Sequence, residues 1–271
     1  MCGIVGIVSN KSVSASIIGA LKKLEYRGYD SAGISTISNG QINEQKCSGR
    51  VDNLEKILFQ NPSTGDLGIG HVRWATHGIP NQVNAHPHSS EVVSVVHNGI
   101  IENSDSLRKE YKQKGYSFKS QTDTEVITIM LTDFLKKEDL IDCIHKTLEK
   151  LEGSFALGVI FKDFNNLVVG ARRGSPLAVG YGHGENFIGS DSYALKSMTN
   201  KISYLDDGDF CILYKEKVEF YNSNKKKINK EIFELSNEDN VADKGDYKDF
   251  MSKEINEQSA TTKKCINEYL D

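Results

Sequence analysis

The sequence has few of the residues and patterns that mark secreted or membrane-spanning proteins. Of its 271 residues, 4 are proline and 5 are cysteine, and no two cysteines have CxxC spacing. This odd count argues against a disulfide framework or a cysteine-zinc site and favours a reducing compartment. No apolar run approaches the ~18 residues that a spanning helix needs, and no basic-then-apolar leader opens the chain. We therefore expect a cytoplasmic protein with no membrane contact.

An excess of positive charge is also missing. The 33 lysines and arginines are outnumbered by 37 acidic residues, which gives a net charge of −4. This balance predicts no nucleic-acid partner, and the lysines at 225–227 are interpreted as a solvated hairpin tip. A hydrophobic content of 38% and a charged content of 26% are typical of a globular protein. The length suits one large domain or two small ones.

Apolar periodicity predicts an α+β fold. Helices are expected at 13–24, 51–60, 104–114, 126–135, 139–151 and 192–197. Strands are expected at 4–9, 34–38, 41–47, 67–75, 92–96, 155–161, 167–171, 177–182, 187–189, 202–205 and within a hairpin at 210–221. Because strands and helices come in blocks, antiparallel sheets with segregated helices are favoured over a doubly wound parallel sheet. Residues 1–236 form the expected domain, and 237–271 are interpreted as a linker with an interrupted helix.

Several local signals refine these elements. Asn39-Gly40 predicts a two-residue hairpin turn between two strands. Ser12 and Asp139 are expected to cap the helices that follow them. The segment 122–125, with Thr first and Glu last, matches a capping box.

The N-terminus offers a candidate nucleophile. Cys2 directly follows Met1 and precedes a glycine-punctuated apolar run. If Met1 is removed, Cys2 carries a thiol and a free α-amino group, and the amine can take the thiol's proton directly or through one water. Their reference pKa values, about 8.5 for the thiol and about 8 for the amine, make that transfer nearly isoenergetic. The alternative is that Cys2 is a small buried residue, the commoner fate of a free cysteine.

Asn98-Gly99 offers a pair of hydrogen-bond donors, expected at the end of a strand. Amide hydrolysis passes through a tetrahedral oxyanion, which fixed donors stabilise. The Asn98 side-chain amide and the Gly99 backbone N–H could supply both. A simple Asn-Gly turn is the alternative interpretation.

A free amino acid carries a carboxylate and an ammonium, so its site needs one charge of each sign. Arg73 can hold a carboxylate through two parallel hydrogen bonds. Asp123, at an expected helix start, can accept from an ammonium. The alternative for Asp123 is helix capping, whereas Arg73 stands in a polar segment with Trp74 and Thr76.

Five histidines in the first hundred residues raise the question of a metal site. They are His71, His77, His86, His88 and His97. None forms an HExxH motif, and no acidic residue lies conveniently between them. We therefore expect no metal and interpret these histidines as donors that order loops around the substrate.

Seven motifs together resemble one family, the class II glutamine amidotransferase domain. The match is closest to the N-terminal half of the glucosamine-6-phosphate synthases, and it covers nearly the whole chain in the family's order. The motifs are CGIVG (2–6), EYRGYDSAG (25–33), RWATHG (73–78), NAHPH (84–88), HNGIIEN (97–103), TDTE (122–125) and GSPL (174–177).

The resemblance implies an N-terminal-nucleophile fold, in which two antiparallel sheets pack between helical layers. It implies Cys2 as nucleophile with its own amine as base, Asn98 and Gly99 as the oxyanion hole, and Arg73 and Asp123 as the glutamine ligands. Further implied roles are lining or closing the pocket, by Trp74, Thr76, His77 and His86, and support of the nucleophile's loop, by Arg27. No cofactor is implied.

The resemblance also implies partners. In the family, a sugar-isomerase half follows this domain and uses the ammonia to convert fructose 6-phosphate to glucosamine 6-phosphate, a step of hexosamine biosynthesis in a homodimeric enzyme. We expect the chain to hydrolyse L-glutamine and to lack that half, since it ends where the connecting segment is expected. Two alternatives remain: a glutaminase that supplies ammonia to another acceptor, and a non-catalytic docking or regulatory domain.

Overall fold

The structure, a computed structural model, describes residues 2–235 and 245–270. The chain divides into two units, residues 1–236 and 237–271, and each is described by itself. In the second unit, the helix α7 spans Phe250–Leu270. No helix in the described ranges is both long and apolar enough to cross a membrane.

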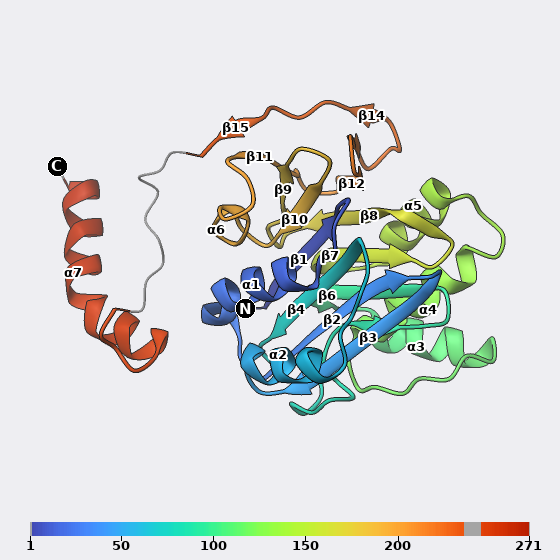
Figure 1. Ribbon diagram of the computed structural model, residues 1–271, viewed down its shortest axis with the longest axis horizontal. Helices are drawn as coiled ribbons and strands as arrows, with labels where there is room; N and C mark the ends of the chain where they lie inside the picture. Colours follow the sequence, from blue (N-terminus) through green and yellow to red (C-terminus); the bar gives the residue numbers. More distant parts are fainter. Residues whose placement is uncertain (1, 236–244, 271) are drawn as a thin grey trace. The chain divides into compact units, whose positions relative to one another are not determined.

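Two antiparallel sheets form the centre of the first unit (Figure 1). The larger sheet has the order β15-β11-β9-β10-β1-β4-β2-β3. Its strands span Phe233–Glu234 (β15), Lys201–Tyr204 (β11), Ala178–Tyr181 (β9), Asn186–Gly189 (β10), Gly3–Val8 (β1), Leu67–Arg73 (β4), Ser31–Ser38 (β2) and Gln41–Ser48 (β3). β1 therefore lies in the interior of the sheet, hydrogen-bonded on both sides to β10 and β4.

The smaller sheet has the order β14-β13-β12-β8-β7-β6-β5. Its strands span Lys227–Ile228 (β14), Val218–Tyr221 (β13), Phe210–Tyr214 (β12), Phe164–Arg173 (β8), Gly153–Phe161 (β7), Val93–Ile101 (β6) and His88–Ser89 (β5). Its long strands β6, β7 and β8 run side by side as sequential antiparallel neighbours.

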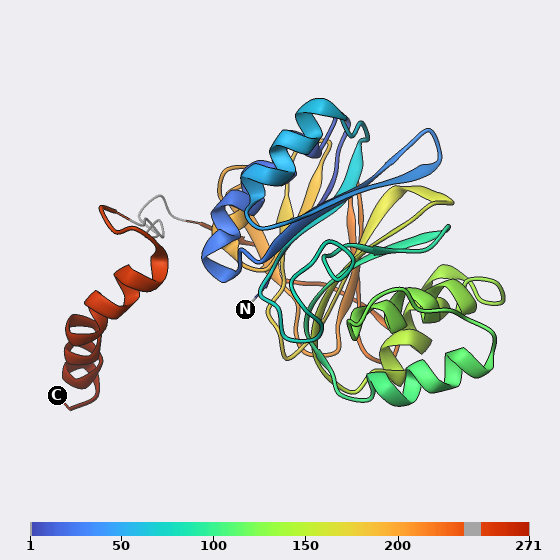
Figure 2. The same cartoon turned by 90° about the horizontal axis from the view of Figure 1, so that it is seen from below.

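Helices cover the outer face of each sheet (Figure 2). On the larger sheet lie α1 (Ser14–Leu24) and α2 (Val51–Gln60), with the short elements η1 (Glu25–Arg27) next to β4 and α6 (Ser192–Leu195) next to β9 and β10. Helices α3 (Ser104–Gln113), α4 (Thr124–Phe134) and α5 (Leu140–Lys150) lie on the smaller sheet's side. The result is a four-layer α+β sandwich, as the sequence predicts.

Three apolar clusters hold these layers together. One joins the inner faces of the two sheets, with Ile4 and Ile69 from the larger sheet against Val96 and Ile160 from the smaller. The other two lie beneath the outer helices. All six residues of β1 are buried, because the strand is covered by helix α1 on one face and by the second sheet on the other. Burying apolar surface on both faces is what fixes this central strand.

Two local predictions are confirmed. Asn39 and Gly40 have φ values of 53° and 66°, as a type I′ hairpin turn requires, and they join β2 to β3. The Asp139 side chain caps α5 by accepting a hydrogen bond from the Asp142 N–H at 2.9 Å.

Both other capping predictions are wrong. Helix α1 begins at Ser14, and its N-cap position is Val13, which makes no side-chain capping bond. The expected capping box fails because its two side chains have other partners. The Thr122 hydroxyl contacts His88 Nε2 at 2.9 Å, and the Glu125 carboxylate accepts from the backbone N–H groups of Lys119 and Ser120.

Several element boundaries also differ from expectation. Asn98-Gly99 does not end a strand, because β6 continues through both residues to Ile101 and pairs with β7 throughout. The expected strand at 34–38 begins earlier, at Ser31. The expected interruption in the C-terminal helix is absent, since α7 runs without a break through its 21 residues.

Candidate active site

The thiol of Cys2 lies beside the backbone of Trp74. The Trp74 N–H donates to Cys2 Sγ at 3.2 Å, and the thiol contacts the Trp74 carbonyl oxygen at 3.4 Å. Cys2 is partly accessible, whereas Cys143 and Cys211 are buried, and burial raises the pKa of both these thiols to about 12. Partial accessibility at the start of a central strand distinguishes Cys2 from these two core cysteines.

Burial also raises the pKa of the Cys2 thiol, while the Trp74 N–H and the positive charge of Arg73 act in the opposite direction. The net direction is upward, so the neutral thiol is favoured and a proton acceptor is needed to form the nucleophilic thiolate. The amine that processing would expose on Cys2 is suited to that task. Residue 1 itself lies outside the described residues.

The Asn98 side chain reaches from the second sheet to the nucleophile's own backbone. Its Nδ2 donates to the carbonyl oxygen of Cys2 at 2.9 Å and to Ser190 Oγ at 2.9 Å. Its Oδ1 lies 3.0 Å from His71 Nε2. Asn98 is only 7% exposed, so these contacts fix the amide in a buried position next to the thiol-bearing residue.

Gly99 follows Asn98 in β6 with a φ of 127°, which side-chain-bearing residues rarely adopt. A Cβ at this position would lie 2.0 Å from the carbonyl oxygen of Ser154 on the neighbouring strand. Both observations require glycine here. The backbone N–H expected to be the second oxyanion donor therefore belongs to a residue that cannot be replaced without moving β7.

Arg73 is 3% exposed, and its guanidinium points at the loop that follows it. Nη2 donates to the backbone carbonyls of His77 and Gly78, and Nη1 donates to that of Ile79 at 3.5 Å. Burial lowers the pKa of Arg73, and the nearby charges of Cys2 and Asp123 oppose that effect. Arg73 thus lies within electrostatic reach of both the nucleophile and the expected ammonium ligand.

Asp123 is 7% exposed and precedes α4, but its side chain does not cap that helix. Its Oδ2 accepts instead from the backbone N–H of Ile101 in β6 at 2.8 Å. The capping alternative for Asp123 is therefore wrong. The bond ties the carboxylate to the same strand that carries Asn98, while Arg73 approaches from β4 in the other sheet.

Arg27 supports this region through Asp191. Its Nε and Nη2 lie 2.9 and 2.8 Å from Asp191 Oδ2, which also accepts from the Tyr26 hydroxyl at 2.6 Å. Ser190, next to Asp191, accepts from the backbone N–H of Ile4 at 2.7 Å. The Ser-Asp pair at the end of β10 therefore connects η1, the first residues of β1 and the Asn98 amide.

The loop after β4 rests on the glycine-rich turn after η1. The Asp30 N–H donates to the Arg73 carbonyl at 3.0 Å, and Asp30 Oδ2 accepts from the Ala75 N–H at 2.8 Å. A Cβ on Gly28 would lie 2.6 Å from the backbone of Arg73 and Trp74. This close approach explains why the sequence needs glycine there.

The remaining residues of this loop are accessible. Trp74 is 40% exposed, and its ring meets that of Tyr29 edge-on at 6.2 Å. The Thr76 hydroxyl lies 3.4 Å from His77 Nδ1, and both side chains are outside the core. Trp74, Thr76 and His77 therefore lie together on one exposed surface loop. They do not form the wall of a preformed pocket.

Four of the five histidines form a buried group. His86 stacks on His71 with ring centroids 4.3 Å apart and meets His88 edge-on at 4.8 Å. The Thr124 hydroxyl bridges His86 Nε2 at 2.7 Å and His97 Nδ1 at 2.9 Å.

Burial keeps these imidazoles neutral. It lowers the pKa of His71 to about 3 and also lowers the pKa of His86, His88 and His97. No cluster of His, Cys, Asp and Glu able to hold a metal occurs within the described residues.

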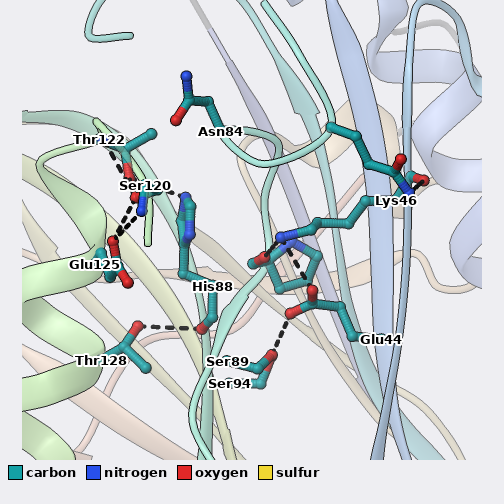
Figure 3. A network of polar contacts seen from close by, with 12 residues as sticks. Glu44, Lys46, Asn84, His88, Ser89, Ser94, Ser120, Thr122, Glu125 and Thr128 are labelled. Carbon is teal, nitrogen blue, oxygen red and sulfur yellow. Dashed lines mark hydrogen bonds and ion pairs between the residues drawn. The ribbon is translucent and has the colours of Figure 1, made fainter. Parts of the chain in front are cut away.

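The segment that contains His88 forms hydrogen bonds on two sides (Figure 3). Lys46 Nζ donates to the Pro87 carbonyl at 3.0 Å from β3. From the α4 side, the Thr122 hydroxyl meets His88 Nε2, and the Thr128 hydroxyl donates to the His88 carbonyl at 3.1 Å. These contacts hold the 84–89 segment between β3 and α4.

A cavity of about 650 Å³ lies beside this network, lined in part by Lys46, His88 and Glu125. Cys2, Asn98 and Arg73 are not among its lining residues. It is therefore a separate feature from the group of residues around the thiol.

Sequence reasoning missed three members of that group: Ser190, Asp191 and Asp30. A polar Ser-Asp pair directly after a buried strand was the available signal for the first two. Asp30 lies in the EYRGYDSAG motif (25–33), in which the resemblance implies a role only for Arg27. What could not be seen from the sequence is that β10 pairs with β1, which brings Ser190 to the nucleophile.

The comparisons with known proteins agree with this geometry. A family model described as "Glutamine amidotransferase domain" matches residues 71–197. The fold is similar to that of glutamine phosphoribosylpyrophosphate amidotransferase from B. subtilis, with a TM-score of 0.68, 24% identity, and coverage of 82% of this chain and 49% of that one. A class-II glutamine aminotransferase domain protein from Silicibacter pomeroyi has a TM-score of 0.60 at 13% identity, with 82% and 99% covered. The family model therefore identifies a glutamine amidotransferase domain over residues 71–197, and the solved structures share the chain's fold.

The chain is also similar along its whole length to glutamine–fructose-6-phosphate aminotransferases. It is 47% identical to the one from Mesorhizobium japonicum over 272 residues, covering 100% of this chain and 45% of that protein. It is 50% identical to the one from Clostridium acetobutylicum over 260 residues, covering 95% and 43%. The chain thus spans about half the length of the curated relatives it matches.

Proposed function

We propose that Cys2 is the nucleophile with which this domain hydrolyses L-glutamine to glutamate and ammonia. The observation that carries the proposal is the position of Cys2: its thiol lies against the Trp74 backbone, and its carbonyl accepts from the Asn98 amide. Arg73 and Asp123 add opposite charges from the two sheets. These are the groups that hydrolysis of a free amino-acid amide requires.

The first half-reaction forms a thioester. The α-amino group of the processed Cys2 takes the thiol proton, and the sulfur attacks the side-chain amide carbon of glutamine. Asn98 Nδ2 and the Gly99 N–H stabilise the oxyanion. The C–N bond then breaks, the nitrogen receives the proton, ammonia leaves, and a γ-glutamyl group remains on the sulfur.

The second half-reaction regenerates the thiol. The Cys2 amine takes a proton from water, the resulting hydroxide attacks the thioester, and glutamate leaves as the proton returns to sulfur. The sum is glutamine plus water giving glutamate plus ammonia.

Asn98 must exchange one hydrogen bond before its amide can stabilise the oxyanion. Both Nδ2 hydrogens of Asn98 are directed at acceptors, the Cys2 carbonyl and Ser190. The oxyanion must replace the Cys2 carbonyl as the acceptor, an exchange that costs little because one strong acceptor substitutes for another.

The names of the relatives support a proposal for the acceptor of the ammonia. The two aminotransferases described above are named for fructose 6-phosphate, and this chain spans 45% of one of them. We propose that the ammonia serves the amination of fructose 6-phosphate to glucosamine 6-phosphate by a sugar-isomerase half, in a cytoplasmic homodimer.

A paired assay tests both parts. Incubation of the 271-residue chain with glutamine should give glutamate and ammonia in equal amounts, and Cys2→Ala should give neither. Adding fructose 6-phosphate should yield no aminosugar from this chain alone. Aminosugar formed only when an isomerase half is supplied supports the acceptor, and ammonia production that persists in Cys2→Ala contradicts the nucleophile.

A further inference from the structure

Two side chains contact the Asn98 amide from opposite ends. His71 Nε2 lies 3.0 Å from Asn98 Oδ1, and Ser190 Oγ lies 2.9 Å from Asn98 Nδ2. Neither has more than 1% of its surface exposed. The sequence predicted no role for Ser190, and for His71 it predicted only a general ordering of loops.

The protonation of His71 is fixed by a third group. Its Nε2 also lies 3.0 Å from the backbone carbonyl oxygen of His97, which can only accept a hydrogen bond. Nε2 must therefore carry the proton, and Nδ1 is the unprotonated nitrogen. Consistently, Nδ1 has no hydrogen-bond partner among the described residues. The Oδ1 end of Asn98 thus faces a donor.

The other end of the amide faces acceptors. The Cys2 carbonyl can only accept, and Ser190 Oγ already accepts from the Ile4 N–H at 2.7 Å. Turning the Asn98 amide by 180° would set Oδ1 against the Cys2 carbonyl and Nδ2 against the His71 N–H. Both contacts would be repulsive in a buried site, where an unmade hydrogen bond costs most.

We propose that His71 and Ser190 are positioning residues that keep the Asn98 amide aimed at the oxyanion. The inference deepens the glutaminase function proposed above and rests on it. When the Cys2 carbonyl gives up its bond to Nδ2, the contacts to His71 and Ser190 remain. They prevent the amide from rotating at the moment when the oxyanion forms.

A pair of substitutions at residue 71 separates the hydrogen bond from the bulk of the side chain. Glutamine can place its amide N–H near the position of Nε2, whereas asparagine is one methylene shorter and cannot. We expect His71→Asn to lower kcat for glutamine hydrolysis about 10–100-fold with KM changed less than about threefold, because only an oxyanion contact is impaired. His71→Gln should recover most of the loss, and equal losses in the two variants overturn the proposal.

A double-mutant cycle shows whether the effect passes through Asn98. In an Asn98→Ala background there is no amide to position, so adding His71→Asn or Ser190→Ala should change kcat by less than about threefold. Full additivity of the losses contradicts the proposal.

His88→Asn is the matched control, because it removes an equally buried imidazole that contacts Thr122 rather than Asn98. If it lowers kcat as much as His71→Asn, general destabilisation explains both.

A spectroscopic measurement distinguishes failure of this inference from failure of the proposed function. Protein labelled with ¹⁵N-asparagine should show an Asn98 side-chain NH₂ pair, identified by its loss in Asn98→Asp, with slow hydrogen exchange. His71→Asn and Ser190→Ala should each speed that exchange at least tenfold, and His71→Gln should not. This result is independent of any glutamine hydrolysis. Unchanged exchange in both variants overturns the positioning role even in an active enzyme.

Discussion

Asn98 Nδ2 donates a hydrogen bond of 2.9 Å to the backbone carbonyl oxygen of Cys2, 96 residues away in the sequence. The bond crosses from the smaller sheet to the larger one, because Asn98 lies in β6 and Cys2 directly precedes β1. The proposed oxyanion donor therefore lies beside the proposed nucleophile before any substrate is present, and it exchanges only the Cys2 carbonyl for the oxyanion. Such preorganisation is the main source of electrostatic rate enhancement in enzymes.

Removing this donor should slow the chemical step. We expect Asn98→Ala to lower kcat for glutamine hydrolysis by about 10²–10³, the typical loss for one oxyanion-hole donor. KM should change little, since the contact is made in the transition state. Steady-state kinetics check this, with thermal unfolding as the control for folding. A loss in kcat smaller than about threefold would show that Asn98 is not the donor.

Asp123 should govern substrate binding instead. Asp123→Asn keeps an oxygen that can accept from the Ile101 N–H but removes the negative charge expected to face the substrate ammonium. We expect KM for glutamine to rise about 10–100-fold, as loss of a charge-assisted hydrogen bond implies, while kcat changes less. Isothermal titration with L-glutamate gives the same comparison without turnover. Unchanged affinity for glutamate contradicts the assignment.

Arg73 links substrate binding to the loop that follows it. A guanidinium that binds a carboxylate through two parallel hydrogen bonds, end-on or side-on, uses a hydrogen on Nη2. In this structure Arg73 Nη2 donates to the backbone carbonyls of His77 and Gly78. Binding of glutamate should therefore release at least one of these carbonyls. We expect hydrogen exchange of the backbone amides at 76–79 and 81 to change on adding L-glutamate. No such change in wild type, at saturating glutamate, excludes the paired grip.

The buried histidines should make stability depend on pH. Burial lowers the pKa of His71 to about 3, and it lowers the pKa of His86, His88 and His97 as well. Below about pH 6.5 the unfolded chain binds protons at these residues and the folded chain does not. The free energy of unfolding is therefore highest above that pH and decreases as the pH falls.

Between pH 7.5 and 5.5, protonation linked to His71 alone should lower the free energy of unfolding by about 1.4 kcal/mol, and the other three histidines should lower it further. Urea unfolding at the two pH values measures the sum. His88→Gln should weaken the pH dependence by the share of one histidine. A free energy of unfolding that is flat across this range contradicts the neutral, buried state.

The sequence was sufficient to predict the fold, and it named most residues of the candidate site. Periodicity and turn signals such as Asn39-Gly40 are local, so they predicted the elements and the antiparallel class. The motif resemblance named Cys2, Asn98 and Arg73 together. A glutamine amidotransferase family model matches residues 71–197, and the fold is similar to that of a solved amidotransferase.

The contacts themselves were not predictable, because they depend on strand pairing and on competition between partners. Thr122 and Glu125 have the residue types of a capping box. Their side chains nevertheless form hydrogen bonds with His88 and with the backbone N–H groups at 119–120. Asp123 looked like a helix cap and instead binds β6. Ser190 lies next to Asn98 only because β10 pairs with β1. A polar side chain before a helix does not reveal which of several nearby donors it will meet.

The central claim is that the Cys2 sulfur carries the γ-glutamyl group. Rapid acid quench of wild-type chain during turnover, followed by peptide mass spectrometry, tests it most directly. We predict a γ-glutamyl adduct confined to the peptide that begins with Cys2, and glutamate formation lowered by roughly 10⁴ or more in Cys2→Ala, as for other catalytic nucleophiles. Glutamate formation by Cys2→Ala within tenfold of the wild-type rate would contradict the account.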